Sequence, residues 1–358
     1  MNNRALNQGG YFCLLGLIFL ILILGTSCQF RKAYPEARHG AKMIFDPVGN
    51  KILLFGGRGE NLTGGKLLND IWVFDSETQD WQEIKTSSPP TSRLSPGFVY
   101  DPSHHQVILF GGYTNKGRLA DTWLLDLDEY QWKEIHPPHS PPARSDMGMA
   151  YDKSNQVVVL FGGYCLENQR DYCDDTWVFD PDLNHWIEMN PISSPPVMYG
   201  HSLNYGSFKQ QILLWGGHMS IMDQGRISSA GYNNSLWSYS YPNNQWIELS
   251  PVNQNKPSPR YWHQAAYDSE IPGLVIFGGD GGYGFLADTW LYNPVLNSWE
   301  KIKFLQPPPA RTVGSLVYSP DDEQIFLFGG LNEDMESFRD TWSFTFNEGG
   351  NWTMISGN

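Results

Sequence analysis

The sequence predicts an all-β fold, a β-propeller of six blades. Pairs of adjacent glycines recur after apolar runs, the pairs lie 51 to 62 residues apart, and tryptophans follow them at fixed spacing. A period of about fifty residues is typical of a propeller array, in which one repeat forms one blade. The pairs are Gly56-Gly57, Gly111-Gly112, Gly162-Gly163, Gly216-Gly217, Gly278-Gly279 and Gly329-Gly330.

Each repeat contains four strand-like pieces, of which the first two precede the glycine pair. The first piece ends in an aromatic residue and usually an aspartate, as in Phe45-Asp46 and Tyr100-Asp101. The second is an unbroken apolar run, as in residues 52–55 and 157–161. A strand without alternation is expected to be buried on both faces, here between neighbouring blades.

The third and fourth pieces each carry a tryptophan. The third contains Asp-Thr-Trp or a close variant, and a second tryptophan follows nine residues later, or ten in the last repeat. We expect the indoles to fill the wedge between blades, and the glycine pair to turn the chain where a Cβ would clash. Proline-rich joints such as Pro89-Pro90 then connect one blade to the next.

This pattern resembles the kelch repeat over about residues 36–356. The resemblance implies a kelch-type propeller with four antiparallel strands per blade, the first of which lines a central channel. The chain begins with an innermost-type strand and ends with an outermost-type strand, so we expect closure without a strand swap. We place the six-bladed propeller at residues 37–356.

Residues 1–27 read as a signal peptide with a lipobox-like end or as a membrane anchor, followed by a short linker at 28–36. Arg4 precedes the apolar run 11–24, and the small residues before Cys28 resemble those of a bacterial lipoprotein, in which the cysteine is lipidated. Gly25 stands where that pattern has an aliphatic residue. An uncleaved anchor, short for a span, and simple secretion are the alternatives. All three place the propeller outside the cytoplasm, at the cell surface or in the periplasm.

Cysteine use and charge bear on the compartment and the partners. Cys165 and Cys173 have seven residues between them, which suits a loop-closing disulfide in an oxidising compartment. A metal or redox pair is less favoured because no histidine lies close beside them.

The net charge of -14 argues against nucleic acid as a partner, since its phosphates would be repelled.

An arginine lies seven residues before the first-strand aromatic in five of the six repeats. These are Arg38, Arg93, Arg144, Arg260 and Arg311. One hypothesis is a cationic ring at the channel mouth that binds a carboxylate. The other is a structural ion pair with the aspartate before the third-strand tryptophan. Repeat four has Met198 and Ser235 at these two positions, so both charges vanish together, as paired partners would.

Repeat four also has the longest loops, at residues 218–234 and 250–259. Long loops at one rim commonly carry binding specificity. Beside them we identify five candidate ligand-binding residues: Tyr199, His201, Tyr261, Trp262 and His263. Their rings could stack on a sugar, and the imidazoles could act as acid–base groups. The alternative is that both histidines are ordinary hydrogen-bonded channel residues.

No serine–histidine–aspartate set, phosphate loop or metal-spaced cluster occurs in the sequence. We therefore expect no cofactor and no metal, and a non-catalytic, monomeric, membrane-tethered module that binds a protein or a glycan at the channel mouth. The alternative is a sugar-directed enzyme, similar to acidic-sugar epimerases or mutarotases, that uses the rim of blades four and five. Asp223 with Arg226, or His201 with His263, would then supply the acid–base groups.

Overall fold

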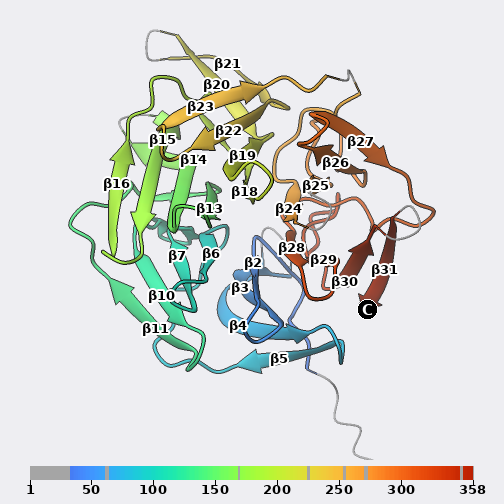
Figure 1. Ribbon diagram of the computed structural model, residues 1–358. Helices are drawn as coiled ribbons and strands as arrows, with labels where there is room; N and C mark the ends of the chain where they lie inside the picture. The colour runs from blue at the N-terminus through green and yellow to red at the C-terminus, as the bar shows by residue number, and fades with distance from the viewer. Residues whose placement is uncertain are drawn as a thin grey trace, which may run out of the picture. The chain divides into compact units, whose positions relative to one another are not determined.

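A computed structural model describes residues 33–357 except for residues 61–63, 168–169, 224–225, 253–254, 270–272 and 347–349 (Figure 1). The predicted signal peptide or anchor, and Cys28 with it, lie outside the described residues. Every regular element in these ranges is a β-strand, and they include no apolar helix of the length needed to cross a membrane.

Six antiparallel sheets of four consecutive strands form the fold, one for each predicted repeat. Blades one to three consist of β2 (Lys42–Asp46), β3 (Lys51–Gly59), β4 (Leu67–Asp75) and β5 (Asp80–Ile84); β6 (Gly97–Asp101), β7 (Gln106–Phe110), β10 (Thr122–Asp126) and β11 (Gln131–Ile135); and β13 (Gly148–Asp152), β14 (Val157–Glu167), β15 (Arg170–Asp180) and β16 (His185–Met189). Blades four to six consist of β18 (Ser202–Gly206), β19 (Gln211–Trp215), β22 (Leu236–Ser240) and β23 (Gln245–Leu249); β24 (Gln264–Asp268), β25 (Gly273–Phe277), β26 (Thr289–Asn293) and β27 (Ser298–Ile302); and β28 (Ser315–Ser319), β29 (Gln324–Phe328), β30 (Thr341–Thr345) and β31 (Asn351–Ser356).

Short strands extend three of these blades toward one face, which we call the rim. Residue pairs just before an innermost strand form β1 (Arg38–His39), β12 (Arg144–Ser145) and β17 (Met198–Tyr199). The first two pair with the extended second strands β3 and β14, and β17 pairs with β20 (His218–Asp223). Strand β20 forms a hairpin with β21 (Arg226–Tyr232), and β8 (Tyr113–Thr114) with β9 (Gly117–Arg118).

The ring closes by packing of the first sheet against the last, without exchange of strands. The innermost strands contact one another in chain order, and β28 completes the ring by contacting β2. The sixth sheet contains only β28 to β31. In Figure 1 the sheets follow one another around a centre from blue to red. The predicted all-β fold of four-stranded antiparallel blades is therefore confirmed, and the described residues form six such sheets without exchange of strands at the closure.

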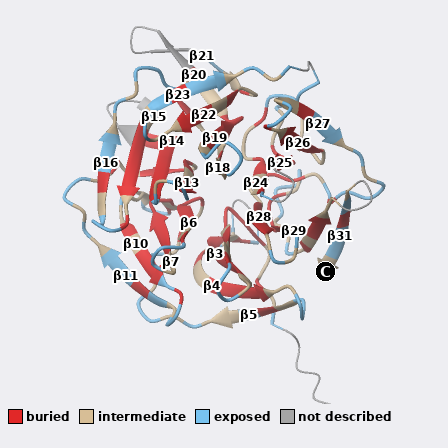
Figure 2. Cartoon of the chain, viewed as in Figure 1, coloured by how far each residue is buried: buried red, intermediate tan, exposed pale blue. Residues whose placement is uncertain are grey.

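The hydrophobic core lies between blades, as the apolar second pieces predict. Six buried clusters each combine residues from two adjacent blades, including one from blades six and one. The second strands are almost entirely buried, whereas each outermost strand buries only its tryptophan and leaves its other positions partly or fully exposed, which Figure 2 shows as red interior and pale blue outer ribbons. Each blade thus buries both faces against its neighbours.

Indole nitrogens connect neighbouring blades through the threonine of the Asp-Thr-Trp motif. The bonds run from Nε1 to Oγ1 in Trp81–Thr341 (3.1 Å), Trp186–Thr122 (3.0 Å), Trp246–Thr176 (3.0 Å) and Trp352–Thr289 (3.1 Å). The first of these joins blade one to blade six. In blade one the motif has Ile71 instead, and Nε1 of the facing Trp132 is buried without a hydrogen-bond partner.

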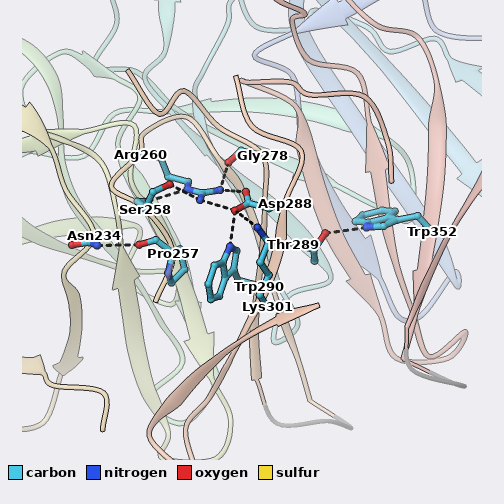
Figure 3. A network of polar contacts seen from close by, with 10 residues as sticks. All are labelled: Asn234, Pro257, Ser258, Arg260, Gly278, Asp288, Thr289, Trp290, Lys301 and Trp352. Atoms are coloured by element: carbon cyan, nitrogen blue, oxygen red, sulfur yellow. Dashed lines mark hydrogen bonds and ion pairs between the residues drawn. The ribbon is translucent and has the colours of Figure 1, made fainter. Parts of the chain in front are cut away.

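The repeated arginine clamps the first strand of its blade to the third, as Figure 3 shows for blade five. Arg260 donates from both terminal nitrogens to the two carboxylate oxygens of Asp288, and from Nη1 to the Gly278 carbonyl at 3.0 Å. Its Nε donates to the Ser258 carbonyl at 3.1 Å. The same aspartate accepts a hydrogen bond from Nε1 of Trp290 at 2.7 Å. Its Nη2 also donates to the Ser258 hydroxyl at 2.9 Å, so all five guanidinium hydrogen bonds of Arg260 are made within the protein.

The clamp recurs in all five blades that carry the arginine. The pairs are Arg38–Asp70, Arg93–Asp121, Arg144–Asp175, Arg260–Asp288 and Arg311–Asp340. Each arginine is at most 1% exposed. The predicted structural ion pair is therefore confirmed. We leave these arginines out of the candidate ligand surface, because a ligand carboxylate would have to displace an aspartate from a buried bidentate pair.

The clamp also perturbs its aspartates. Burial alone would raise the pKa of Asp70, but the hydrogen bonds and charge of Arg38 outweigh it and leave the pKa below its usual range. Asp288 follows the same pattern with Arg260. A lowered pKa in the folded state means that the pair stabilises the fold above the unfolded-state pKa of about 3.9. That contribution is lost as the pH falls through the folded-state value.

The backbone of the same arginine joins its blade to the preceding one. At the closure, Arg38 N–H donates to the Phe338 carbonyl at 3.0 Å, and the Arg38 carbonyl accepts from Gly330 N–H at 2.9 Å. Gly329 has a φ of +67°, and a Cβ there would lie 2.5 Å from the Arg38 carbonyl. The glycine pair is thus required by the close approach of the next blade.

Blade four lacks the clamp, in agreement with its sequence. Met198 is fully buried in place of the arginine, and Ser235 replaces the aspartate. Nε1 of Trp237, which would donate to that aspartate, is buried without a partner. The hydrogen bond from Asn234 to the Pro257 carbonyl, at 2.9 Å, is present in blade four. Blade one has the equivalent bond from Asn69 to the Pro90 carbonyl in addition to its clamp.

We predict that Arg144→Ala lowers the stability of the fold by about 3–5 kcal/mol, because it leaves the Asp175 carboxylate and the Gly162 carbonyl without their donor. The measurement is thermal unfolding followed by circular dichroism. The control is the double variant Arg144→Met/Asp175→Ser, which copies blade four and removes both charges. It should be more stable than the single variant; a single variant that melts with the wild type would contradict the structural role.

We predict that Thr341→Val destabilises the ring closure by about 1–3 kcal/mol, because it leaves the buried Nε1 of Trp81 without an acceptor at almost unchanged volume. Thr345→Val on the same strand is the control, since the Thr345 side chain makes no hydrogen bond to any residue that the structure describes. Equal melting temperatures for the two variants would show that the indole bond contributes nothing.

Candidate functional site

Seven aromatic rings gather on the rim between blades three and five. We call this set the rim cluster: Tyr164, Tyr172, Tyr199, His218, Tyr232, Tyr261 and Trp262. Two cross-strand pairs supply four of the rings, one on the β14–β15 hairpin and one on the β20–β21 hairpin. The other three come from the residues just before the innermost strands of blades four and five. All seven side chains are partly exposed.

Tyr199 lies at the centre of the rim cluster. Its ring centroid is 4.8 Å from Tyr172, 5.4 Å from His218 and 5.6 Å from Tyr261. Tyr164 and Trp262 complete its surroundings at 5.6 and 5.9 Å. Edge-on and tilted pairs at these separations are mutually attractive. The cluster is therefore a preformed surface whose rings hold one another in place.

Two further groups extend the cluster at its edges. The Arg118 guanidinium lies 3.6 Å from the centroid of Tyr164, a close cation–π contact, and 5.4 Å from that of Tyr113. On the opposite side, the loop at Gly282 lies against the ring of Tyr232, and the neighbouring Tyr283 is fully exposed. A partner bound to the cluster would reach both groups.

The rings of the rim cluster are uncharged near neutral pH. Tyrosine is neutral there even in water, and burial raises the pKa of Tyr199 and of Tyr261 farther still. Burial lowers the pKa of His218, although the nearby Asp280 acts in the opposite direction. The surface thus presents ring faces and phenol hydroxyls instead of ionic groups.

Charged loops of opposite sign flank the rim cluster. The loops of blades one and two carry four cations, Arg58, Lys66, Lys116 and Arg118, against the two acids Glu36 and Glu60, of which Glu36 pairs with Lys66 at 3.4 Å. The loops of blades five and six carry one cation, Arg339, against four acids, Asp280, Glu333, Asp334 and Glu336. The last three are exposed. The rim is therefore polarised around an aromatic centre.

The predicted disulfide is present and lies next to the cluster. Cys165 on β14 is bonded to Cys173 on β15, with their Cα atoms 6.0 Å apart. The adjacent residues Tyr164 and Tyr172 face each other across the same hairpin. The crosslink thus restrains the hairpin that supplies two of the seven rings.

Below the cluster, six backbone hydrogen bonds form a closed ring around the channel. Each blade contributes the residue two positions after the clamp arginine, or after Met198 in blade four. The N–H of this residue donates to the carbonyl of the corresponding residue in the preceding blade. The bonds are Gly40 to Val313 (2.9 Å), Ser95 to Gly40 (2.8 Å), Asp146 to Ser95 (3.1 Å), Gly200 to Asp146 (2.8 Å), Trp262 to Gly200 (2.7 Å) and Val313 to Trp262 (2.9 Å). All six residues have a φ between +50° and +66°. This conformation is costly for non-glycine residues, most of all for β-branched Val313.

The central channel holds a cavity of about 420 Å³, lined by the innermost strands. Toward the rim it adjoins a chamber of about 40 Å³ at the backbone ring. Both spaces include His201 and His263 among their lining residues.

The two histidines are buried and hydrogen-bonded. Nε2 of His201 accepts from Gly148 N–H at 3.2 Å, and Nε2 of His263 lies 2.9 Å from the Ser202 hydroxyl. Burial lowers the pKa of His201 to about 3 and that of His263 well below its usual value. Neither imidazole is bonded to a carboxylate. This arrangement matches ordinary channel residues and gives no acid–base pair.

Of the five predicted aromatic and imidazole ligand residues, the structure brings Tyr199, Tyr261 and Trp262 together in the rim cluster. His201 and His263 lie one level deeper, in the channel. The side chains of Asp223 and Arg226, considered for the enzyme alternative, lie outside the part of the molecule that the structure describes. Among the described residues no histidine, cysteine and carboxylate side chains form a group able to hold a metal ion.

Sequence reasoning missed four members of the cluster, Tyr164, Tyr172, His218 and Tyr232. Each lies just beyond a glycine pair or at the far end of the following hairpin. Alignment of the repeats past the glycine pair would have shown aromatic or imidazole residues after it in repeats two to four, at Tyr113, Tyr164 and His218.

Comparison with known proteins identifies the family. The family model described as the KLHDC2/KLHL20/DRC7 Kelch-repeats domain matches residues 26–217 and 191–358. Similar proteins include the F-box/kelch-repeat protein At1g51550 of Arabidopsis thaliana, 30% identical over 70% of this chain and 56% of its own length. Adagio-like protein 1 of rice is 32% identical over 79% of this chain and 46% of its own length.

Multiple epidermal growth factor-like domains protein 8 of mouse is 26% identical over 80% of this chain but only 10% of its own length. The chain thus spans about half, or far less, of the length of the curated relatives that it matches. Two matches of the same family model together cover residues 26–358. The chain therefore belongs to the kelch-repeat family, whose domains generally mediate protein–protein interaction.

Proposed function

We propose that this protein is a binding module that recognises a protein partner through the rim cluster and its charged flanks. The observation that carries the proposal is the packing of seven partly exposed rings around Tyr199, on the face built from the two most extended hairpins. Surface aromatic clusters of this size are commonly interaction sites, and tyrosine, tryptophan and arginine are enriched at the centres of interfaces.

The polarised flanks indicate what a partner must present. Its binding segment should place an apolar or aromatic group on the cluster, an acidic group toward Lys116 and Arg118, and a basic group toward Glu333 and Asp334. Charges at the edge of an interface chiefly select the partner and its orientation. A glycan stacked on the same rings is the competing ligand that the experiment below separates from a protein.

We further propose that the module acts outside the cytoplasm, tethered to a membrane through its N-terminal segment. The apolar run 11–24 and Cys28 support this from the sequence. The Cys165–Cys173 disulfide is consistent with it, because such crosslinks persist mainly in oxidising compartments.

The test is a peptide and glycan array probed with the full-length protein, followed by variants. We predict that Tyr283→Ala weakens binding of the selected peptide about tenfold, since loss of an interface aromatic typically costs more than 1 kcal/mol. Tyr199→Ala should weaken it further. Leu305→Ala, at a fully exposed residue in the joint between blades five and six, is the control and should bind normally. Binding of glycans but no peptides, or normal binding by both tyrosine variants, would refute the proposal.

We predict that Cys28→Ala releases the protein from membranes, because a lipidated cysteine would be the only anchor left after cleavage of residues 1–27. The measurement is fractionation of cells that express the two forms, with detection by antibody. If the variant remains in the membrane fraction at the wild-type level, the anchor is the uncleaved apolar segment and not a lipid on Cys28.

A further inference from the structure

The central channel contains a lysine that has no ion-pair partner among the described residues. Lys42 is the first residue of β2, and it lines both the 420 Å³ cavity and the 40 Å³ chamber. Among the described residues its ammonium group has neither an ion-pair partner within 4.0 Å nor a hydrogen bond. Every other cation in the interior of the fold, the five clamp arginines, is paired with a carboxylate.

The residues of the same layer as Lys42 carry no charge, although the Asp146 carboxylate lines the 40 Å³ chamber that Lys42 also lines. The first residues of the other five innermost strands occupy the same level: Gly97, Gly148, Ser202, Gln264 and Ser315. Among the described residues no aspartate or glutamate lines the 420 Å³ cavity, and its second cation, Lys153, is exposed on the far side from the rim. The Lys42 side chain is partly exposed within the channel, so a ligand that enters the cavity can reach it.

The titratable groups nearest to Lys42 on other blades either accept hydrogen bonds from other residues or are uncharged near neutral pH. Asp146 accepts from Nε1 of Trp262 at 3.0 Å and from the Ser145 hydroxyl at 2.8 Å. Its charge raises the pKa of Lys42, while burial, the larger effect, lowers it. His201 and His263 both have lowered pKa values and add no charge near neutral pH.

Polar groups lie beside the lysine, and apolar walls lie farther along the channel. The Ser315 hydroxyl accepts from Met43 N–H at 2.8 Å, which places it against β2. Gln264 is 2% exposed, and its Oε1 is buried without a partner. Beyond this layer the cavity is lined by apolar side chains, among them Phe98, Met149, Leu203 and Leu316, and then by the first-strand tyrosines.

We propose that the channel binds an organic monocarboxylate, with its carboxylate on the Lys42 ammonium group and its apolar body along the channel toward the tyrosines. The volume falls within the range of small-molecule sites, roughly 300–1,000 Å³. The cavity has both polar and apolar walls, and one cation near the apolar side chains of Phe98, Met149, Leu203 and Leu316 suits a ligand with one charge and an apolar group. This inference does not depend on the proposed partner binding at the rim.

The test uses the full-length protein and three probes that share one apolar group: 4-phenylbutyrate, 4-phenylbutanol and 4-phenylbutylamine. Binding is measured by isothermal titration calorimetry, with the shift in melting temperature as a second measurement. The carboxylate should bind and raise the melting temperature. The alcohol should bind about tenfold more weakly, because it lacks a charge-assisted hydrogen bond, and the amine should not bind. Inorganic phosphate should bind more weakly than the carboxylate.

Two lysine variants serve as a matched pair. Lys42→Met keeps the length of the side chain without the charge and should lose carboxylate binding, whereas Lys153→Met should bind as the wild type does. Equal affinities for the carboxylate and the alcohol, equal affinities of the two variants, or tighter binding of phosphate would overturn the proposal.

If Lys42→Met does not fold, the wild-type protein still gives a test. Acetic anhydride modifies accessible amines, and the Lys42 peptide can be followed by mass spectrometry. We expect 4-phenylbutyrate to protect Lys42 and to leave Lys153 reactive, and equal labelling of Lys42 with and without the carboxylate would refute the site.

Discussion

The buried arginine–aspartate clamp is the interaction on which the arrangement of the blades depends. A guanidinium with almost no exposure would be strongly destabilising alone, but here two carboxylate oxygens and two carbonyls accept its hydrogen bonds. The side chain fixes the entry to the innermost strand against the third strand of its own blade. The backbone of the same residue bonds to the preceding blade. One residue per repeat thus fixes both the conformation within a blade and the placement of the next blade.

Blade four, which lacks this clamp, lies in the middle of the candidate site. Met198 replaces the arginine, and the next residue is Tyr199, the ring with the most neighbours in the rim cluster. Met198 and Tyr199 pair as strand β17 with the long β20–β21 hairpin, as Arg38–His39 and Arg144–Ser145 pair with β3 and β14 in blades that keep the clamp. A departure from the repeat pattern at one position is commonly a sign of function, and here it coincides with the densest aromatic surface.

The fold was predictable from the sequence because every repeat contains the motifs that define a blade. The site was less predictable because it depends on contacts between repeats. The glycine pairs, the Asp-Thr-Trp motifs and the joint replacement of the arginine by Met198 and of the aspartate by Ser235 predicted the blades and the clamp correctly. Tyr199, Tyr261 and Trp262 were identified because they lie beside long loops. Tyr172 and Tyr232 were not, because each meets the cluster only after its hairpin folds back over a neighbouring blade. His201 and His263 were predicted to lie at the rim. They lie just below it, buried in the channel, and so are not part of the rim cluster.

Trp262 connects the rim cluster to the channel. Its ring lies 4.4 Å from Tyr261 and 5.9 Å from Tyr199, and its backbone belongs to the ring of six hydrogen bonds in a left-handed conformation. Its indole nitrogen donates to Asp146, whose charge acts on Lys42. A residue held in an unfavourable backbone conformation persists only where its surroundings determine it on several sides. Here those surroundings are the aromatic surface on one side and the chamber that Lys42 lines on the other, so one side chain forms part of the wall of both.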